Sequence, residues 1–273
     1  MEEKIVLHNN KKLGYRVTGN GPIVVLLHGF GEDATVWENQ YNYLQGYRVI
    51  IPDLPGTGLS ELSSETSMES MAEAVYHVIK EEQKTLSSNE YQQIVLIGHS
   101  MGGYAALALA EKYPALLKGL GLFHSSAFAD TADKIETRRK GIQFIKEHGP
   151  YEFLKTIIPN LYSPLTKRNN PEIIEQQIAK SNNFSDNSLV SYYTAMINRK
   201  DRTNVLKESK LPVLFVLGKY DTAVPLNDGL QQCKMPVFSY IHILENSAHM
   251  GMFEEIKDTN LLLTNYLEST LKS

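Results

Sequence analysis

One serine of this chain lies in a pattern that converts a hydroxyl group into a nucleophile. Ser100 is the centre of a G-x-S-x-G motif and is flanked by Gly98 and Gly102. The β-rich apolar run Gln93–Ile97 precedes the motif, and the helix-forming run Ala105–Ala110 follows it. A turn that passes from strand to helix in so few residues strains the serine backbone, and only glycine-sized neighbours allow such close packing. We therefore expect Ser100 to be a nucleophile supported by the two glycines.

The elements that must position this serine alternate along most of the chain. Runs typical of strands alternate with runs typical of helices, which predicts an α/β fold with a mostly parallel central sheet of about eight strands flanked by helices. Ile23–Leu27 is a continuous apolar run, as expected for a strand buried on both faces. The first two strands are more polar and are expected to form an antiparallel hairpin at the sheet edge. The expected strands are Lys4–His8, Lys12–Val17, Ile23–Leu27, Arg48–Ile51, Gln93–Ile97, Leu120–Phe123, Pro212–Leu217 and Val237–Leu244, and the expected helices include Met68–Lys84 and Phe253–Leu271.

The alternation stops in the middle of the chain, from about Phe128 to Leu206. This segment has no long β-rich run, and it carries helical patterns such as Ile142–Ile145 and Pro171–Ile178. We predict an α/β core at residues 1–126 and 206–273, with a helical cap inserted at residues 127–205. Such a cap would cover the carboxyl edge of the sheet, where ligands bind in open α/β sheets.

Five motifs of the core follow one another in an order that points to a known family. On these motifs the chain resembles the α/β-hydrolase fold superfamily, in particular its small, capped, esterase-like serine hydrolases. The resemblance covers the core and does not extend to the cap. The motifs are the His-Gly-aromatic turn at His28–Gly31, the D-x-x-G-x-G-x-S turn at Asp53–Ser60, the G-x-S-x-G turn, the turn Gly218–Pro225 and the loop Asn246–Met250. We interpret the second of them as a structural turn.

The resemblance implies a Ser-His-Asp triad. A serine hydroxyl is barely acidic, so Ser100 needs a base within hydrogen-bond reach. The family places its catalytic histidine at His249, after the last strand, and its acid at Asp221, after the strand Pro212–Leu217. The order Ser…Asp…His is the order that this fold uses. His242 is a poorer base because it lies within a strand, whereas Asp228 is expected on a surface helix and Glu245 on the wrong side of the loop.

The resemblance also implies an oxyanion hole. Acyl transfer places negative charge on the former carbonyl oxygen, which preorganised backbone N–H groups stabilise. One N–H comes from Met101 and the other from Phe30, whose side chain would line the acyl pocket. Within the same turns, Gly29 and His28 are expected to support the loop, and His99 to pack or to form local hydrogen bonds.

Composition excludes several other classes. The chain has 273 residues, an ordinary 42 % of hydrophobic and 21 % of charged residues, and a formal net charge of −4. An acidic balance argues against nucleic acid and anionic membranes as partners. The single cysteine, Cys233, forms no internal disulfide, and the chain begins without a signal-peptide pattern, so we expect a cytoplasmic protein. No H-E-x-x-H or C-x-x-C motif is present, and we expect neither a metal nor a cofactor.

These residues favour a serine hydrolase that cleaves small to medium carboxylic esters through an acyl-enzyme. Thioester cleavage, a cofactor-free haloperoxidase-like activity and carbon–carbon bond hydrolysis would use the same triad. A cap arginine placed to bind a substrate carboxylate (Arg138, Arg139 or Arg199) would favour carbon–carbon hydrolysis. A hydrolase-fold ligand receptor is the alternative outside enzymes, because fold alone does not determine function.

The expected partner is a small ester or related acyl substrate, and a homodimer is compatible with the sequence. The cap aromatics considered as pocket lining are Tyr151, Phe153, Tyr162, Tyr192 and Tyr193.

Overall fold

A central sheet flanked by helices organises the molecule. The computed structural model describes residues 1–86 and 93–271. Residues 87–92 and 272–273, which fall within the predicted core ranges, lie outside the described residues. In the described part, eight strands form one open sheet in the order β1-β2-β4-β3-β5-β6-β7-β8. The strands are β1 (Glu2–His8), β2 (Lys11–Thr18), β3 (Ile23–Leu27), β4 (Arg48–Pro52), β5 (Ile94–His99), β6 (Leu117–Phe123), β7 (Pro212–Gly218) and β8 (Phe238–Leu244).

The predicted fold class is confirmed, and so is the edge hairpin. β1 pairs antiparallel with β2, and β2 pairs antiparallel with β4, whereas all pairs from β4 to β8 are parallel. Every residue of β3 is buried, because the strand has neighbours on both edges and helices on both faces. The carboxyl ends of the parallel strands therefore share one edge of the sheet. The motifs predicted to carry chemistry lie at this edge, directly after the strands.

Helices cover both faces of the sheet. Met68–Lys84 is helical as predicted, and the C-terminal helical stretch is interrupted at Glu255. One apolar cluster joins the sheet to α2, α3, α8 and α9, and a second joins the opposite face to α10 and α11. The described helices are α1 (Glu38–Tyr41), α2 (Met68–Lys84), α3 (Met101–Lys112), α4 (Ala132–Ile157), α5 (Pro164–Asn169), α6 (Pro171–Lys180), α7 (Asp186–Ile197), α8 (Thr203–Glu208), α9 (Leu226–Cys233), α10 (Gly251–Glu254) and α11 (Ile256–Leu271).

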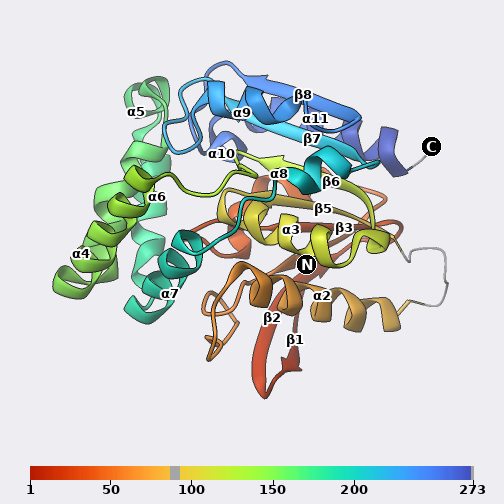
Figure 1. Cartoon of the computed structure of the whole chain (residues 1–273), viewed down its shortest axis with the longest axis horizontal. Coiled ribbons are helices and arrows are strands. Elements are labelled where there is room, and N and C mark those ends of the chain that lie inside the picture. The colour runs from red at the N-terminus through yellow and green to blue at the C-terminus, as the bar shows by residue number, and fades with distance from the viewer. Residues whose placement is uncertain (87–92, 272–273) are drawn as a thin grey trace.

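The segment between β6 and β7 is helical in the described structure. Helices α4 to α7 gather on one side of the sheet, as Figure 1 shows, and we call these helices and their connections the cap. α4 is bent at Gly149, whose φ of 85° leaves the helical region, and Pro150 follows it. Cap residues join both apolar clusters, including Tyr192 in one and Phe153 in the other. The division into core and cap domains stays a prediction.

No helix in the described residues is both long and apolar enough to cross a membrane.

Candidate active site

Ser100 lies on the turn between β5 and α3 and has a backbone conformation that few residues adopt. Its φ is 51° and its ψ is −118°. Such a non-glycine conformation costs about 1–3 kcal/mol and persists only where surrounding contacts enforce it. Here the Ser100 N–H donates to the carbonyl of Phe123 (2.9 Å), and the Ser125 hydroxyl donates to the carbonyl of Ser100 (2.7 Å). The end of β6 thus holds the strained turn from the neighbouring strand.

The glycines around Ser100 stand where neighbouring atoms leave little room for a side chain. A Cβ at Gly98 would lie 2.3 Å from the carbonyl oxygen of Gly102, and a Cβ at Gly102 would lie 2.5 Å from that of His28. At Gly29 a Cβ would lie 3.1 Å from the Cβ of Ser100. These contacts give the steric reason for glycine at all three positions, two of which bring the turn against the loop after β3.

The structure brings Ser100, His249 and Asp221 into one line. The Ser100 Oγ lies 2.9 Å from Nε2 of His249, and Nδ1 of His249 donates to Oδ2 of Asp221 at 2.8 Å. The other carboxylate oxygen of Asp221 accepts from the N–H groups of Ala223 and Val224, at 2.9 Å each. The hydroxyl therefore faces a base whose second nitrogen is held by an acid, and the acid is held by its own turn.

Burial and charge act in opposite directions on this pair. Burial opposes ionisation of Asp221, but the His249 ring and the hydrogen bonds around the carboxylate hold the pKa of Asp221 below its usual value. Burial likewise opposes protonation of His249, but the carboxylate of Asp221 raises the pKa of His249 above its usual value. An anionic acid beside a more basic imidazole is the state in which His249 accepts a proton from Ser100.

The loop that carries His249 is tied to the cap. The His249 N–H donates to the carbonyl of Leu161 at 2.9 Å. One carboxylate, that of Glu254, accepts from the Ser163 N–H (2.7 Å), the Thr166 hydroxyl (2.7 Å) and the Ala248 N–H (2.8 Å). The cap therefore takes part in placing the base.

The two residues expected to form the oxyanion hole lie at the ends of neighbouring strands. Met101 is the first residue of α3, so its N–H is one of those that a helix leaves without an intrahelical acceptor. Phe30 follows β3, lines the cavity beside Ser100, and stacks on Tyr193 with ring centroids 4.2 Å apart. Their role as oxyanion donors stays a prediction.

Two histidines near the site make structural contacts. His28 donates from Nδ1 to the carbonyl of Gly29 (2.9 Å) and accepts at Nε2 from the Leu54 N–H (2.9 Å), which joins its loop to the turn Asp53–Ser60. His99 lies 2.9 Å through Nδ1 from the carboxylate of Glu32 and donates from Nε2 to the carbonyl of His249 at 3.0 Å. Both rings brace loops of the site.

A cavity of about 580 Å³, counting the space at its open mouth, adjoins Ser100 and His249. Its walls are mainly apolar and aromatic, with Glu32 and Arg138 as the charged members. A second hollow of about 510 Å³, again counting the open space at its mouth, lies beyond Phe30 and reaches Tyr162. The first cavity is lined by Phe30, Glu32, Ser100, Tyr104, Arg138, Ile157, Leu161, Tyr193, Met196, Ala223, Val224 and His249.

The three arginines considered for substrate binding differ in position. Arg138 lines the cavity, and its Nε donates a hydrogen bond to Oδ2 of Asp130 at 2.6 Å. Arg199 is buried and lies 2.7 Å from the same carboxylate, whereas Arg139 is exposed. Burial opposes the charge on Arg138, but Asp130 raises the pKa of that guanidinium. Arg138 and Arg199 thus share the carboxylate of Asp130, and of the three arginines Arg138 is the one that lines the cavity.

The cap aromatics also separate into groups. Tyr193 lines the cavity of Ser100, and Phe153 packs behind it at a centroid distance of 5.7 Å. Tyr162 lines the second hollow and Tyr192 is buried in the core. Tyr151 lies beneath Lys155, away from both hollows.

The other acids and the other base named from the sequence lie elsewhere. Asp228 is exposed on α9, Glu245 is exposed and pairs with Lys219, and His242 lies within β8. Among the described residues, one group of histidines and carboxylates is close enough to hold a metal, namely His124, Asp221 and His249. A metal there would break the hydrogen bond between Asp221 and His249, so the absence of a metal and of a cofactor stays our prediction.

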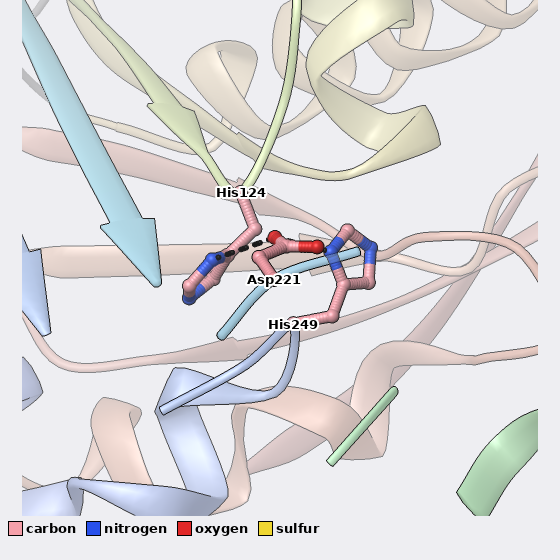
Figure 2. A group of neighbouring side chains, drawn as sticks. All are labelled: His124, Asp221 and His249. Carbon is pink, nitrogen blue, oxygen red and sulfur yellow. Dashed lines mark hydrogen bonds and ion pairs between the residues drawn. The ribbon is translucent and has the colours of Figure 1, made fainter. Parts of the chain in front are cut away.

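Sequence reasoning missed three residues of this site. Glu32 and Glu254 bridge loops through hydrogen bonds, which no local pattern indicates. His124 approaches Asp221 from the side opposite His249, as Figure 2 shows. A signal did exist for His124, since it directly follows the strand Leu120–Phe123 and polar residues at that edge of a parallel sheet face the site.

Comparisons with known proteins agree with this fold. Residues 22–143 match the family model described as alpha/beta hydrolase fold. An esterase structure from Thermogutta terrifontis, titled as malate bound, superposes with a TM-score of 0.90 at 28 % identity and covers 99 % of both chains. The chain therefore has the α/β-hydrolase fold. Curated relatives of this hydrolase include 2-hydroxy-6-oxo-6-phenylhexa-2,4-dienoate hydrolase of Comamonas testosteroni (27 % identity, covering 93 % of this chain and 90 % of the relative) and Lipase 1 of Psychrobacter immobilis (28 %, 94 % and 81 %). It is therefore an enzyme, and these relatives cleave more than one kind of bond.

Proposed function

We propose that this hydrolase cleaves small to medium carboxylic esters through an acyl-enzyme on Ser100. The alignment of Ser100, His249 and Asp221 at the wall of a largely apolar cavity carries the proposal. A likeness to the Thermogutta terrifontis esterase over 99 % of both chains supports it.

The geometry suggests the following reaction. Ser100 attacks the ester carbonyl carbon while Nε2 of His249 accepts its proton, and the negative charge on the carbonyl oxygen faces the N–H groups of Phe30 and Met101. The alcohol leaves with the proton from His249. A water molecule then gives a proton to the same nitrogen and attacks the acyl-enzyme, which releases the acid and restores Ser100.

Labelling and a substrate panel test this proposal together. A fluorophosphonate should label Ser100, and p-nitrophenyl esters of increasing acyl length should be turned over with a preference for short and medium chains, which fit the cavity. A thioester of the preferred acid, assayed beside the ester, ranks the two substrate classes. Absence of both label and ester turnover at neutral pH would overturn the proposal, with Ser100→Ala as the matched blank.

Carbon–carbon bond hydrolysis is the second candidate, and two observations favour it. Arg138 presents a charged guanidinium to the cavity, and curated relatives at 27 % and 26 % identity bear the names of such hydrolases. A substrate carboxylate would pair with Arg138 while the triad acts on a nearby carbonyl.

A pair of neighbouring arginines separates the two candidates. If the substrate carries a carboxylate, Arg138→Gln should lower kcat/KM for a 2-hydroxy-6-oxohexa-2,4-dienoate by about tenfold or more, because a charged hydrogen bond is lost. Arg139→Gln removes an exposed charge from the same helix and should change little. Labelling of Ser100 without ester turnover would move the assignment to carbon–carbon hydrolysis.

A further inference from the structure

His124 is a fully buried histidine that the triad reaction does not use directly. It follows β6 and has a φ of 47°, in the left-handed region where histidine, asparagine and aspartate are enriched among residues other than glycine. Its ring centroid lies 5.7 Å from that of His249. Figure 2 shows the Asp221 carboxylate between the two rings.

A carboxylate oxygen of Asp221 lies close to one ring nitrogen of His124. Nδ1 lies 3.2 Å from Oδ2 of Asp221, the oxygen that also accepts from His249. Within the described part of the chain, neither nitrogen has a well-aligned hydrogen-bond partner. A small rotation about the Cβ–Cγ bond would align Nδ1 with the carboxylate, and such hydrogen bonds often tighten when substrate binds.

This surrounding favours one tautomer. A proton on Nδ1 points toward a carboxylate oxygen. A proton on Nε2 instead leaves a buried N–H without an acceptor and sets two lone-pair atoms 3.2 Å apart. Because a buried unpaired N–H is costly and lone pairs repel, the Nδ1–H tautomer is the stable one.

Two glycines leave the space that the His124 ring occupies. A Cβ at Gly218, the last residue of β7, would lie 2.9 Å from Cε1 of His124, and a Cβ at Gly251, the first residue of α10, would lie 2.7 Å from Nε2. The ring thus fits between the strand that leads to Asp221 and the helix that follows His249.

We propose that His124 is a positioning residue of the triad, which donates from Nδ1 to Asp221 on the side opposite His249. The hydrogen bond fixes the rotation of the carboxylate and takes up part of its negative charge, so that His249 is less basic than it would be beside Asp221 alone. This proposal rests on the proposed use of the triad, and it does not depend on which acyl substrate is cleaved.

The charges around the group agree with a neutral donor. Burial lowers the pKa of His124 to about 4, although Asp221 opposes this shift. Besides Asp221, the titratable groups that act on His124 are the rings of His99 and His249. Glu32, after β3, and Glu254, on α10, both raise the pKa of His249. Removing the His124 donor leaves more negative charge on Asp221 and should raise the pKa of His249 further.

Two substitutions of equal shape test the donor. In His124→Asn the amide nitrogen stands where Nδ1 stood, and asparagine tolerates a positive φ. His124→Leu has the same branching without a donor. Relative to the unmodified enzyme, we expect His124→Leu to lower kcat by about tenfold with KM nearly unchanged, and to move the acid limb of the kcat/KM profile up by about half a pH unit. His124→Asn should restore both values to within about threefold and a few tenths of a pH unit.

The readouts distinguish positioning from mere folding. Leucine strains the left-handed backbone, so the folded fraction is counted by titrating Ser100 with the fluorophosphonate, and kcat is expressed per labelled site. If His124→Leu keeps the kcat and the acid limb of the unmodified enzyme, or if the two variants behave alike, the proposal is wrong.

A measurement on the unmodified protein covers the case in which His124→Leu fails to fold. The ¹⁵N shifts of labelled histidines, assigned with His124→Asn, report the tautomer of each ring. We expect a neutral Nδ1–H ring at His124 near pH 7; an Nε2–H tautomer or a charged ring would overturn the proposal. This result is independent of ester turnover, so failure here differs from failure of the proposed function.

Discussion

The carboxyl edge of the sheet and the cap bound the same cavity but are built in different ways. At the sheet edge, backbone hydrogen bonds hold the reacting groups, as when Asp221 accepts from Ala223 and Val224. The cap reaches the cavity mostly through apolar side chains, among them Leu161 and Tyr193. Backbone hydrogen bonds fix atoms in position, whereas apolar walls tolerate changes that conserve volume. The sheet edge therefore determines the reaction, and the cap determines what fits.

Removing the nucleophile should produce the largest difference between activity and stability. Ser100→Ala is expected to lower kcat by about 10⁶-fold, the size known for loss of a triad serine. Its free energy of unfolding should change little, because the hydroxyl faces a cavity. Ser100→Gly should be equally inactive but more stable than Ser100→Ala by about 1 kcal/mol, because φ is 51° at this position. Chemical denaturation and ester turnover measure the two effects; substantial activity in either variant would contradict the nucleophile.

Removing the acid should have the second largest effect on kcat and should also shift the pH profile. Activity is lost as the pH falls through the raised pKa of His249, because the base must be neutral to accept a proton. Asp221→Asn removes the charge that raises this pKa, so the acid limb should move to lower pH while kcat falls by about 10⁴-fold. Asp228→Asn makes the same chemical change on an exposed helix and should leave the profile unchanged. An acid limb that stays in place in Asp221→Asn would show that another group governs it.

The contact between the two regions should give a smaller effect. Glu254→Gln weakens the hydrogen bonds that join Ser163 and Thr166 of the cap to the loop of His249. We expect kcat to fall by about three- to tenfold and the free energy of unfolding to fall by about 1–3 kcal/mol, because a charged acceptor is lost. Glu245→Gln changes an exposed carboxylate at the start of the same loop and is the control. Equal kcat values in the two variants would mean that the cap does not help to place His249.

The same contrast explains what the sequence could predict. The sheet and its edge hairpin followed from local runs such as Ile23–Leu27, because a strand buried on both faces must be apolar throughout. The placement of Ser100, His249 and Asp221 followed from short motifs in a known order. Nothing local indicated the role of Glu254, since the cap residues that its carboxylate binds, Ser163 and Thr166, lie 91 and 88 residues away. His124 was missed for a related reason: the carboxylate beside its ring, that of Asp221, belongs to the turn after a different strand.

The smallest expected effect is the loss of a helix cap, which tests whether the cap unfolds together with the core. Ser67 caps α2 in the core, where its side chain accepts from the Ser70 N–H, and Thr131 caps α4 in the cap, where it accepts from the Lys134 N–H. Each substitution by alanine should cost about 1 kcal/mol. Because cap residues such as Tyr192 and Phe153 belong to the same apolar clusters as the sheet, both variants should shift one common unfolding transition.

Calorimetry of the two capping variants shows whether the cap and the core unfold in one transition or in two. If Thr131→Ala instead produces a separate, earlier transition while Ser67→Ala shifts only the main one, the cap is an independent unit that can open over the cavity. Ester turnover should be unaffected in Ser67→Ala, whose site lies in the core at the start of α2. A loss of turnover in Thr131→Ala at temperatures below the main transition would then assign cavity closure to the cap, because the sheet edge that holds the triad would still be folded.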